Sequence, residues 1–587
     1  MSVLEVPRLS FSGRITWDPI VTNNSAHFYD EQACETTLRP GETAQDFRQS
    51  AIAAVGNGGG NWNPHGTHRS IFFDTTVSSV SLPGAHPSTT EDRMVGQPVA
   101  FEGMLVDSEP YGAFSSQLFF DTLQFGIDGG ARILAPRSTR MTARRINFKR
   151  NLGYGYIAGG ASVMWQTAFD KEGLLVQPHD SAVLAAFEQA LADDDVLGLT
   201  VRWNAYRTIY YANEAMSDST VAKAEYARLT GQLEAGGFQP NPAVSHVVGV
   251  LGLWRRGEPA AVGGDRFLVS TGATPIASAY ARIGDGRVTL DLQNSIPEDG
   301  LDLKKHDYGP LELVAVDPGS RETTSLGTLE PSAYSREIYV RDGGLVELPL
   351  PKAVDAAALE TCDLHLRNAG NTDLLVELPR YACPESPNTY LTEGESRATR
   401  VRVLERGKPA AGQSVHLVDV NDSGKRTSFE TDAEGVAEVQ VRGADGGGVT
   451  SFYLLVGDQP TPSQLNPIND PYCYVRALPK DDQIAALPPT WENVYQNVLI
   501  NWHAMAPCMD NWLDLGDEAQ MRRYALILRK LTDPEAIEHY RFMPVTRDMT
   551  PGARTLLWKW IDGAEASAET ESWTLAREQR NLRQRMK

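Results

Sequence analysis

The chain has 587 residues and carries 54 Lys and Arg against 75 Asp and Glu, a formal net charge of −21 at pH 7. This surplus of carboxylates disfavours nucleic acid as a partner, because affinity for phosphates comes from clustered Lys and Arg that displace counterions. No segment approaches the ~20 consecutive apolar residues of a membrane helix, so the sequence predicts no membrane partner either.

At roughly 150 residues per domain, the length predicts about three to five domains. The first part of the chain reads as short strands, rich in β-branched and aromatic residues and bounded by Gly, Pro, Asn or Asp. These runs cover residues 9–19, 70–82, 116–127, 197–213, 246–254 and 286–296. We expect a barrel-like or sandwich-like N-terminal region in two β-rich domains, residues 1–175 and 176–394, with helical insertions at 180–195 and 218–237.

The next unit, residues 395–487, alternates apolar and polar residues in runs separated by the turns "GKPAAG", "NDSGK" and "DAEG". Regularly spaced short strands of this kind predict an Ig-like β-sandwich. Asp419, Asn421 and Asp422 could suggest a calcium loop, but the EF-hand spacing is not met, so a hairpin turn is the favoured interpretation.

From residue 488 onward the pattern becomes helical, which predicts a small C-terminal helical region over residues 488–587. Thr490, Asp517, Asp533 and Thr550 are expected N-caps of its helices. The expected helical segments are 490–505, 517–531, 533–543, 550–563 and the tail from 566. The predicted fold class is therefore a β-dominated multidomain α+β protein.

The start of the chain has no basic region followed by an apolar region, so the expected compartment is the cytoplasm. Five cysteines are scattered without C-x-x-C spacing, which argues against a disulfide framework and against a cysteine zinc site. The basic run "RSTRMTARRINFKRN", residues 137–151, could hold an anionic ligand, although a solvated basic edge is the favoured interpretation.

The stretch "GNGGGNWNPHGTHRSIFFD", residues 56–74, is the first choice for a site. It lacks the lysine and the following helix of a phosphate loop. His65 and His68 could instead clip a mononuclear metal ion from a loop, with His27 as a third ligand. The competing interpretation is a structured β-connection whose histidines only form hydrogen bonds.

Other chemical signatures are weak. His246 and His503 are expected to be hydrogen-bonded core imidazoles, although an axial role toward haem stays open. The chain has no G-x-S-x-G elbow, no catalytic-cysteine signature and no dinucleotide fingerprint, so its catalytic residues stay unknown. The run Asp193–Asp195 is unusual because carboxylates at a helix C-terminus oppose the helix dipole.

Several segments resemble known proteins in the same order. They are "VPRLSFSG" near the start, "VDSEP" at 106–110, "ALADDDVLGLTV" at 190–201, "VVGVLGLWRRGEP" at 247–259 and "FMPVTRDMTPGARTLLWKWI" at 542–561. Together they resemble the N-terminal, non-ferritin-like region of the violacein-pathway iminophenyl-pyruvate dimer synthase family and, more loosely, the chromopyrrolic acid synthases. The resemblance implies haem-containing oxidoreductases of bacterial secondary metabolism that couple two imine-form indole-pyruvate units.

The sequence also differs from these relatives in one respect. These relatives continue into a ferritin-like helical domain with Glu and Glu-x-x-His metal ligands, and "EAIEH", residues 535–539, does not supply that pattern. We therefore expect no ferritin-type di-metal centre here, and the resemblance places no functional residue.

Two functions stay open. The first is an oxidative tailoring enzyme of natural-product biosynthesis, acting on an aromatic or amino-acid-derived metabolite with haem or a mononuclear metal ion. The second is a non-catalytic scaffold or intermediate-binding partner of a separately encoded enzyme, such as a ferritin-like protein. A homodimer is expected from the relatives. The aromatic residues that could line an apolar pocket are Trp62, Phe72, Phe73, Phe125, Tyr210 and Trp254.

Overall fold

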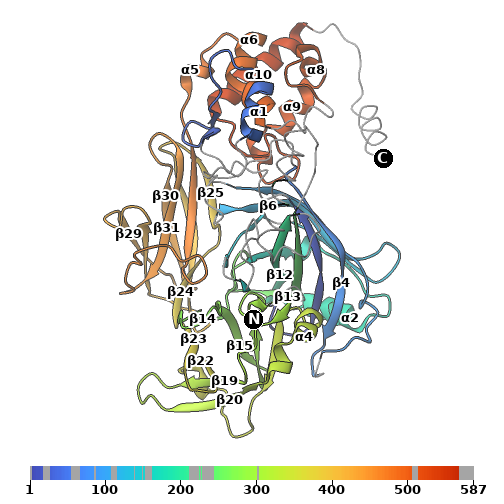
Figure 1. The fold of residues 1–587 in the computed structure, drawn as a ribbon, viewed down its shortest axis with the longest axis vertical. Helices are drawn as coiled ribbons and strands as arrows, with labels where there is room; N and C mark the ends of the chain where they lie inside the picture. The colour runs from blue at the N-terminus through green and yellow to red at the C-terminus, as the bar shows by residue number, and fades with distance from the viewer. Residues whose placement is uncertain are drawn as a thin grey trace.

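The computed structural model describes most of the chain and divides it into three β-rich parts and one helical part (Figure 1). The described residues are 3–17, 27–53, 67–84, 88–107, 115–137, 139–147, 150–152, 162–210, 224, 227, 243–299, 303–505 and 513–567. The predicted β-dominated fold with a small C-terminal helical region is confirmed.

A curved antiparallel sheet forms the first part. Its strands, in spatial order, are β10 (Ser162–Asp170), β12 (Val196–Tyr210), β13 (Ala243–Arg255), β1 (Arg8–Trp17), β4 (Arg69–Ser81), β5 (Val99–Val106), β6 (Gln117–Gly126), β7 (Arg132–Pro136) and β11 (Leu175–Gln177), with β8 (Met141–Thr142) beside β6. β1 lies between β4 and β13, so the first strand of the chain is central in the sheet. The long predicted strands are confirmed, and an aromatic core that includes Phe11, Phe101 and Trp203 fills the concave side.

Helix α2 (Ala182–Leu191) confirms the first predicted insertion. The Ser181 hydroxyl accepts a hydrogen bond from the Leu184 N–H at 3.2 Å, and Val183, Leu184 and Phe187 are buried in the core of the curved sheet. The short 3₁₀ segment η2 (Lys171–Gly173) precedes it. After α2 the Asp193–Asp195 run forms a turn whose carboxylates face Arg255, at 3.3 Å from Asp193 and 3.7 Å from Asp195. The second predicted insertion, 218–237, lies almost wholly outside the described residues.

An eight-stranded sheet forms the second part. Its strands, in spatial order, are β20 (Thr323–Leu329), β19 (Leu311–Val316), β22 (Asp363–Asn368), β23 (Asp373–Glu377), β14 (Arg266–Ser270), β15 (Ala279–Gly284), β16 (Arg287–Asp291) and β21 (Leu345–Pro349). Short helical segments are η3 (Pro331–Tyr334), α4 (Arg336–Arg341) and η4 (Ala358–Glu360). A small sheet of β18 (Lys304–Lys305), β17 (Glu298–Asp299) and β9 (Asn151–Leu152) joins this part to the basic segment that precedes β9.

Two facing sheets form the third part, a β-sandwich around a single apolar core. One sheet contains β24 (Arg380–Pro384), β26 (Ser396–Glu405), β27 (Lys408–Pro409) and β30 (Val436–Arg442); the other contains β25 (Asn388–Thr392), β32 (Tyr472–Leu478), β31 (Gly448–Val456), β28 (Ser414–Asp419) and β29 (Arg426–Glu430). In β30 the buried Val439 and Val441 alternate with exposed Gln440 and Arg442, the period-two pattern of a strand with one solvated face. The loop with Asp419 and Asp422 connects β28 to β29, which confirms the hairpin turn.

The helical part occupies one end of the molecule (Figure 1). Its elements are α5 (Asp482–Ala485), α6 (Trp491–Val494), the π-helical segment η5 (Tyr495–Leu499), α7 (Ile500–Met505), α8 (Glu518–Arg523), α9 (Ala525–Leu531), η7 (Pro534–Ala536) and α10 (Pro551–Ser567). The side chains of Thr490, Asp517 and Asp533 cap helices as expected. The Thr550 hydroxyl also accepts a hydrogen bond from the Ala553 N–H at 3.3 Å, and Asp481 accepts further hydrogen bonds from N–H groups at the start of α10. None of the helices in the described ranges has the length and apolar character needed to cross a bilayer.

An N-terminal segment packs into this helical part. Helix α1 (Ala44–Ala53) and the hairpin of β2 (Tyr29–Asp30) and β3 (Glu35–Thr36) lie among the C-terminal helices (Figure 1). Phe47 shares a core with Trp502 and Trp560. The helical part is therefore built from both ends of the described chain, and the boundaries predicted at residues 175, 394 and 487 stay predictions.

The predicted helix over residues 533–543 is wrong, because only the single turn η7 forms. The guanidinium of Arg547 donates hydrogen bonds to the carbonyl groups of Ile537, His539 and Val545. The His539 carbonyl also accepts a turn hydrogen bond from the Phe542 N–H at 3.1 Å, so the carbonyl groups of this segment are shared between short turns and the Arg547 side chain, and no continuous helical ladder forms.

Candidate functional site

His68 immediately precedes β4 and is held by the backbone of β5. Its Nδ1 lies 2.8 Å from the carbonyl oxygen of Leu105, and the Leu105 N–H donates to the His68 carbonyl at 2.7 Å. Burial lowers the pKa of His68 to about 4, with a smaller lowering effect from the Arg547 guanidinium. The imidazole is therefore neutral at pH 7, and with Nδ1 donating to a carbonyl, Nε2 carries the lone pair, as in histidines that bind metals.

The other two predicted metal ligands are placed differently. His27 is exposed in the turn before β2, where its carbonyl oxygen accepts a hydrogen bond from the Thr37 hydroxyl at 2.7 Å. His65 lies outside the described residues. Across the described ranges, no group of three or more His, Cys, Asp or Glu side chains is arranged to hold a metal ion. Of the three predicted ligands, His68 is the one with ligand-like geometry in the described structure.

Asp548 lies at the centre of a buried hydrogen-bond cluster close to His68. Its carboxylate accepts hydrogen bonds from the Tyr29 hydroxyl at 2.5 Å, from the Trp502 indole N–H at 3.1 Å and from the Thr546 hydroxyl. Three donors allow a carboxylate to remain buried at 4% exposure. Burial and the neighbouring Asp548 raise the pKa of Tyr29 well above its usual value, so the phenol stays protonated. The cluster ties β2 to the helical part.

Cys34 lies beside this cluster and has a positive φ of 57°. The Arg476 guanidinium contacts its sulfur at 3.1 Å, yet burial outweighs that charge and raises the pKa of Cys34 to about 11. A thiolate is the nucleophilic form of cysteine, so this thiol is not an activated nucleophile at neutral pH.

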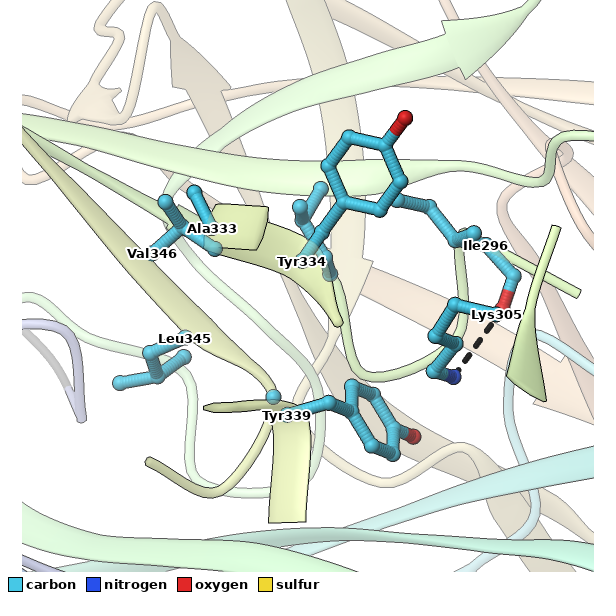
Figure 2. A pocket seen from close by; sticks show the side chains of 9 residues that line it. Ile296, Lys305, Ala333, Tyr334, Tyr339, Leu345 and Val346 are labelled. Carbon is cyan, nitrogen blue, oxygen red and sulfur yellow. Dashed lines mark hydrogen bonds between the residues drawn. The ribbon is translucent and has the colours of Figure 1, made fainter. Parts of the chain in front are cut away.

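A second candidate centre is a small cavity beside Lys305, in the part of the molecule that contains the eight-stranded sheet (Figure 2). The Lys305 amine donates to the Ile296 carbonyl at 3.1 Å and to the Glu298 carboxylate, and it lies 3.3 Å from the centroid of the Tyr339 ring. Burial and the nearby Arg150 lower the pKa of Lys305 to about 7, so the amine can exchange a proton near neutral pH. The lining residues are Leu292, Ile296, Lys305, Ala333, Tyr334, Tyr339, Gly344, Leu345 and Val346.

The size of this cavity limits its chemistry. Its volume is about 10 Å³, room for one water molecule, whereas ligand pockets span hundreds of Å³. In this conformation Lys305 can hold or move a proton to a water molecule, and an aromatic metabolite does not fit beside it.

The basic segment 137–151 is not the solvated edge that the sequence favours, because Arg144, Arg145 and Arg150 are all buried. The guanidinium of Arg150 binds both oxygens of Glu298, at 2.7 and 2.8 Å, and donates to the Tyr339 hydroxyl at 2.9 Å. Arg150 and Lys305 thus share one buried carboxylate. This bidentate pairing makes Arg150 a structural link between the curved sheet and the eight-stranded sheet.

The aromatic residues expected to line a ligand pocket have other roles. Phe72 and Phe125 belong to the core of the curved sheet, and the Phe73 ring lies under the Arg14 guanidinium at 4.6 Å. Trp254 lines a second water-sized cavity of about 10 Å³, together with Arg202 and neighbouring side chains. Trp62 and the side chain of Tyr210 lie outside the described part of the structure.

The comparisons with known proteins give one informative relative. No family model matches the chain. The chain is 24% identical over 644 residues to the 2-imino-3-(indol-3-yl)propanoate dimerase of Chromobacterium violaceum, covering 97% of this chain and 59% of that protein. The chain thus spans less than two thirds of the length of this curated relative. The similarity supports the relation to imine dimer synthases predicted from the motifs.

The similar solved structures are remote. Escherichia coli alpha-2-macroglobulin in its native conformation matches with 10% identity and a TM-score of 0.13, covering 82% of this chain and 27% of that protein. The trypsin-activated form matches with 9% identity and a TM-score of 0.14, covering 81% of this chain and 29% of that protein. TM-scores this low carry no argument about fold or function.

Proposed function

We propose that this protein is an oxidative tailoring enzyme of bacterial natural-product biosynthesis that acts on an aromatic, amino-acid-derived metabolite. The observation that carries the proposal is the similarity to an imine dimerase along 97% of the chain. The substrate class follows from that relative: an arylpropanoate with an imino or keto group. Dioxygen or peroxide is the oxidant, which accepts two electrons and two protons for each pair of substrates coupled or each substrate dehydrogenated.

The proposed cofactor is haem or a mononuclear metal ion, which would supply the electron transfer to the oxidant. His68 supports this proposal, because its imidazole is neutral and its Nδ1 is oriented by the Leu105 carbonyl. His65 and His27 remain the proposed companion ligands. We further propose that the protein acts in the cytoplasm, that it forms a homodimer, and that a separately encoded ferritin-like protein takes over its product.

The first test of the cofactor is an absorption spectrum with elemental analysis of the freshly purified protein. We expect a Soret band or near-stoichiometric iron, copper or zinc. The variant His65→Ala combined with His68→Gln is expected to lose the bound group and keep its melting temperature within a few degrees. The control His179→Gln, an exposed histidine, is expected to keep the bound group. Equal metal or haem content in both variants would reject the ligand assignment.

The test of activity uses indole-3-pyruvate with an ammonium salt, since the keto acid and ammonia equilibrate with the imine. We expect oxygen consumption and oxidised or coupled products by mass spectrometry. If the protein is colourless and metal-free, binds the keto acid and leaves it unchanged, the alternative function as a scaffold or intermediate-binding partner replaces the enzyme proposal.

A further inference from the structure

Arg144, in the basic segment, is a buried arginine whose side chain makes no hydrogen bond with the described residues. Its backbone is fixed by two hydrogen bonds of 2.9 Å with Met164, one in each direction. The residue is 8% exposed, and Nε, Nη1 and Nη2 all lack a hydrogen-bond partner among the described residues. The guanidinium carbon lies 4.5 Å from the centroid of the Tyr472 ring. Arg144 is thus a buried cation positioned by stacking and by its backbone.

Two neighbouring arginines, Arg145 and Arg402, differ from Arg144 because their guanidinium groups donate hydrogen bonds. Arg145 donates to the Tyr280 hydroxyl at 3.1 Å and to the carbonyl oxygen of Ile468 at 3.2 Å. Arg402, in β26, donates to the Glu434 carbonyl at 3.0 Å and to the Glu385 carboxylate at 3.2 Å. Arg144 differs from both, although all three lie close enough to Cys383 for their charges to act on its thiol.

Within the described part of the chain, no carboxylate forms an ion pair with Arg144. Cys383 and Cys473 are buried thiols whose pKa values the Arg144 charge lowers slightly. Burial has the larger effect and raises the pKa of each to about 12, so both thiols are neutral. The Tyr472 hydroxyl is a second buried polar group without a partner in the described ranges. A guanidinium keeps its charge in proteins, and a buried charge without a counter-ion is strongly destabilising. The described residues of this junction therefore supply no anion to Arg144.

We propose that the junction between the curved sheet and the sandwich binds a carboxylate at Arg144. The guanidinium presents parallel N–H groups in one plane, which match the two oxygens of a carboxylate. The guanidinium carbon lies 4.5 Å from the Tyr472 ring centroid, its three nitrogens have no hydrogen-bond partner among the described residues, and the Tyr472 hydroxyl would supply a further donor. The inference stands on the unsatisfied guanidinium and is independent of the proposed oxidative function.

Acetate is the probe for the direct test. Equilibrium dialysis of the full chain against radiolabelled acetate is expected to find about one acetate bound per chain. Arg144→Met, which keeps the side-chain volume and removes the charge, is expected to weaken this binding by ~10-fold or more. The control Arg400→Met removes an arginine that is 57% exposed on the same sandwich strand, β26, as Arg402, and is expected to bind acetate as the wild type does. Equal acetate binding by Arg144→Met and the wild type would overturn the proposal.

A melting series distinguishes a carboxylate site from an unselective anion site. Acetate replaces chloride at constant ionic strength, and we expect acetate to raise the melting temperature of the wild type by about 2–4 °C and that of Arg144→Met by nothing measurable. Equal stabilisation by both anions would overturn the carboxylate assignment. Should Arg144→Met fail to fold, Arg144→Lys and Tyr472→Phe provide the second measurement. Both keep a cation at the junction, and both are expected to bind acetate more weakly than the wild type; unchanged binding in both would reject the site.

Discussion

Two arginines of one segment, six positions apart in sequence, are buried in opposite ways. Arg150 meets the carboxylate of Glu298 and the hydroxyl of Tyr339, and Lys305 shares that carboxylate. Arg144 meets an aromatic face and two neutral thiols. The first arrangement is complete within the described protein and holds two sheets together. The second has no counter-ion among the described residues, so it marks the place where we propose that a ligand binds.

The largest effect is expected from removing the carboxylate that completes the first arrangement. Glu298→Gln leaves Arg150 as a buried cation without its carboxylate partner and removes the counter-ion of Lys305, and we expect the free energy of unfolding to fall by ~3–5 kcal/mol. Urea denaturation at pH 7 measures this loss. The matched control is Glu518→Gln, which removes a half-exposed partner of Arg522 on α8 and is expected to cost about 0.3–0.5 kcal/mol. A loss at Glu298 no larger than at Glu518 would remove the contrast between the two arginines.

A medium effect on the free energy of unfolding is expected from the pH-dependent protonation of the Lys305 amine. Its folded-state pKa of about 7 lies below its usual value of 10.5, so between these values the unfolded chain binds more protons than the folded chain. The unfolding free energy contributed by Lys305 therefore rises with pH across this window, by about 3 kcal/mol between pH 7 and 9.5, and is lowest below pH 7. Urea midpoints measured from pH 6.5 to 9.5 are expected to lose this rise in Lys305→Met. The control Lys304→Met changes the exposed neighbour on β18 and is expected to keep the rise. An identical pH profile in both variants would show that Lys305 is not desolvated.

The smallest effect is expected at His246 on β13, whose ring lies 5.6 Å from that of Tyr206 in the same junction as Arg150. Burial and nearby arginines lower the pKa of His246 to about 4. Between pH 6.5 and 4 the unfolded chain therefore binds the extra proton, and this contribution to stability is lost as the pH falls. We expect His246→Gln to reduce the acid-induced loss by about 1 kcal/mol, since partial exposure lets solvent screen the arginine charges. Melting temperatures at pH 4.5 and 7 measure this, with His179→Gln as the exposed control, and a loss unchanged from the wild type would contradict the assignment.

The strands were largely predictable from sequence because alternation and β-branched content report directly which face of a strand is buried. This holds for β4 and for β30. The conformation of segment 533–543 was not predictable from sequence. The guanidinium of Arg547, further along the chain, donates hydrogen bonds to two carbonyl groups of this segment. Local pattern cannot reveal a side chain that captures the carbonyl groups of another segment.

The candidate sites were less predictable than the fold. The choice of His68 came from sequence, but its orientation by Leu105 required β4 and β5 to be paired. Glu298 and Lys305 lie in a charged stretch that reads as a solvated loop, and only Arg150, 148 positions before Glu298, makes their burial tolerable. No sequence signal distinguishes Arg144 from Arg145, since partners from distant strands decide which of the two is satisfied.

The packing of α1 among the C-terminal helices also affects when this part can fold during synthesis, because its two halves are made at different times. Phe47 leaves the ribosome about 500 residues ahead of Trp560, with which it shares a core. At ~5–20 residues per second, the apolar face of α1 stays without its final neighbours for on the order of half a minute to two minutes. Through that interval the three β-rich parts can form while the nascent N-terminal segment is a target for chaperones, and α10 then completes the core that α1 began.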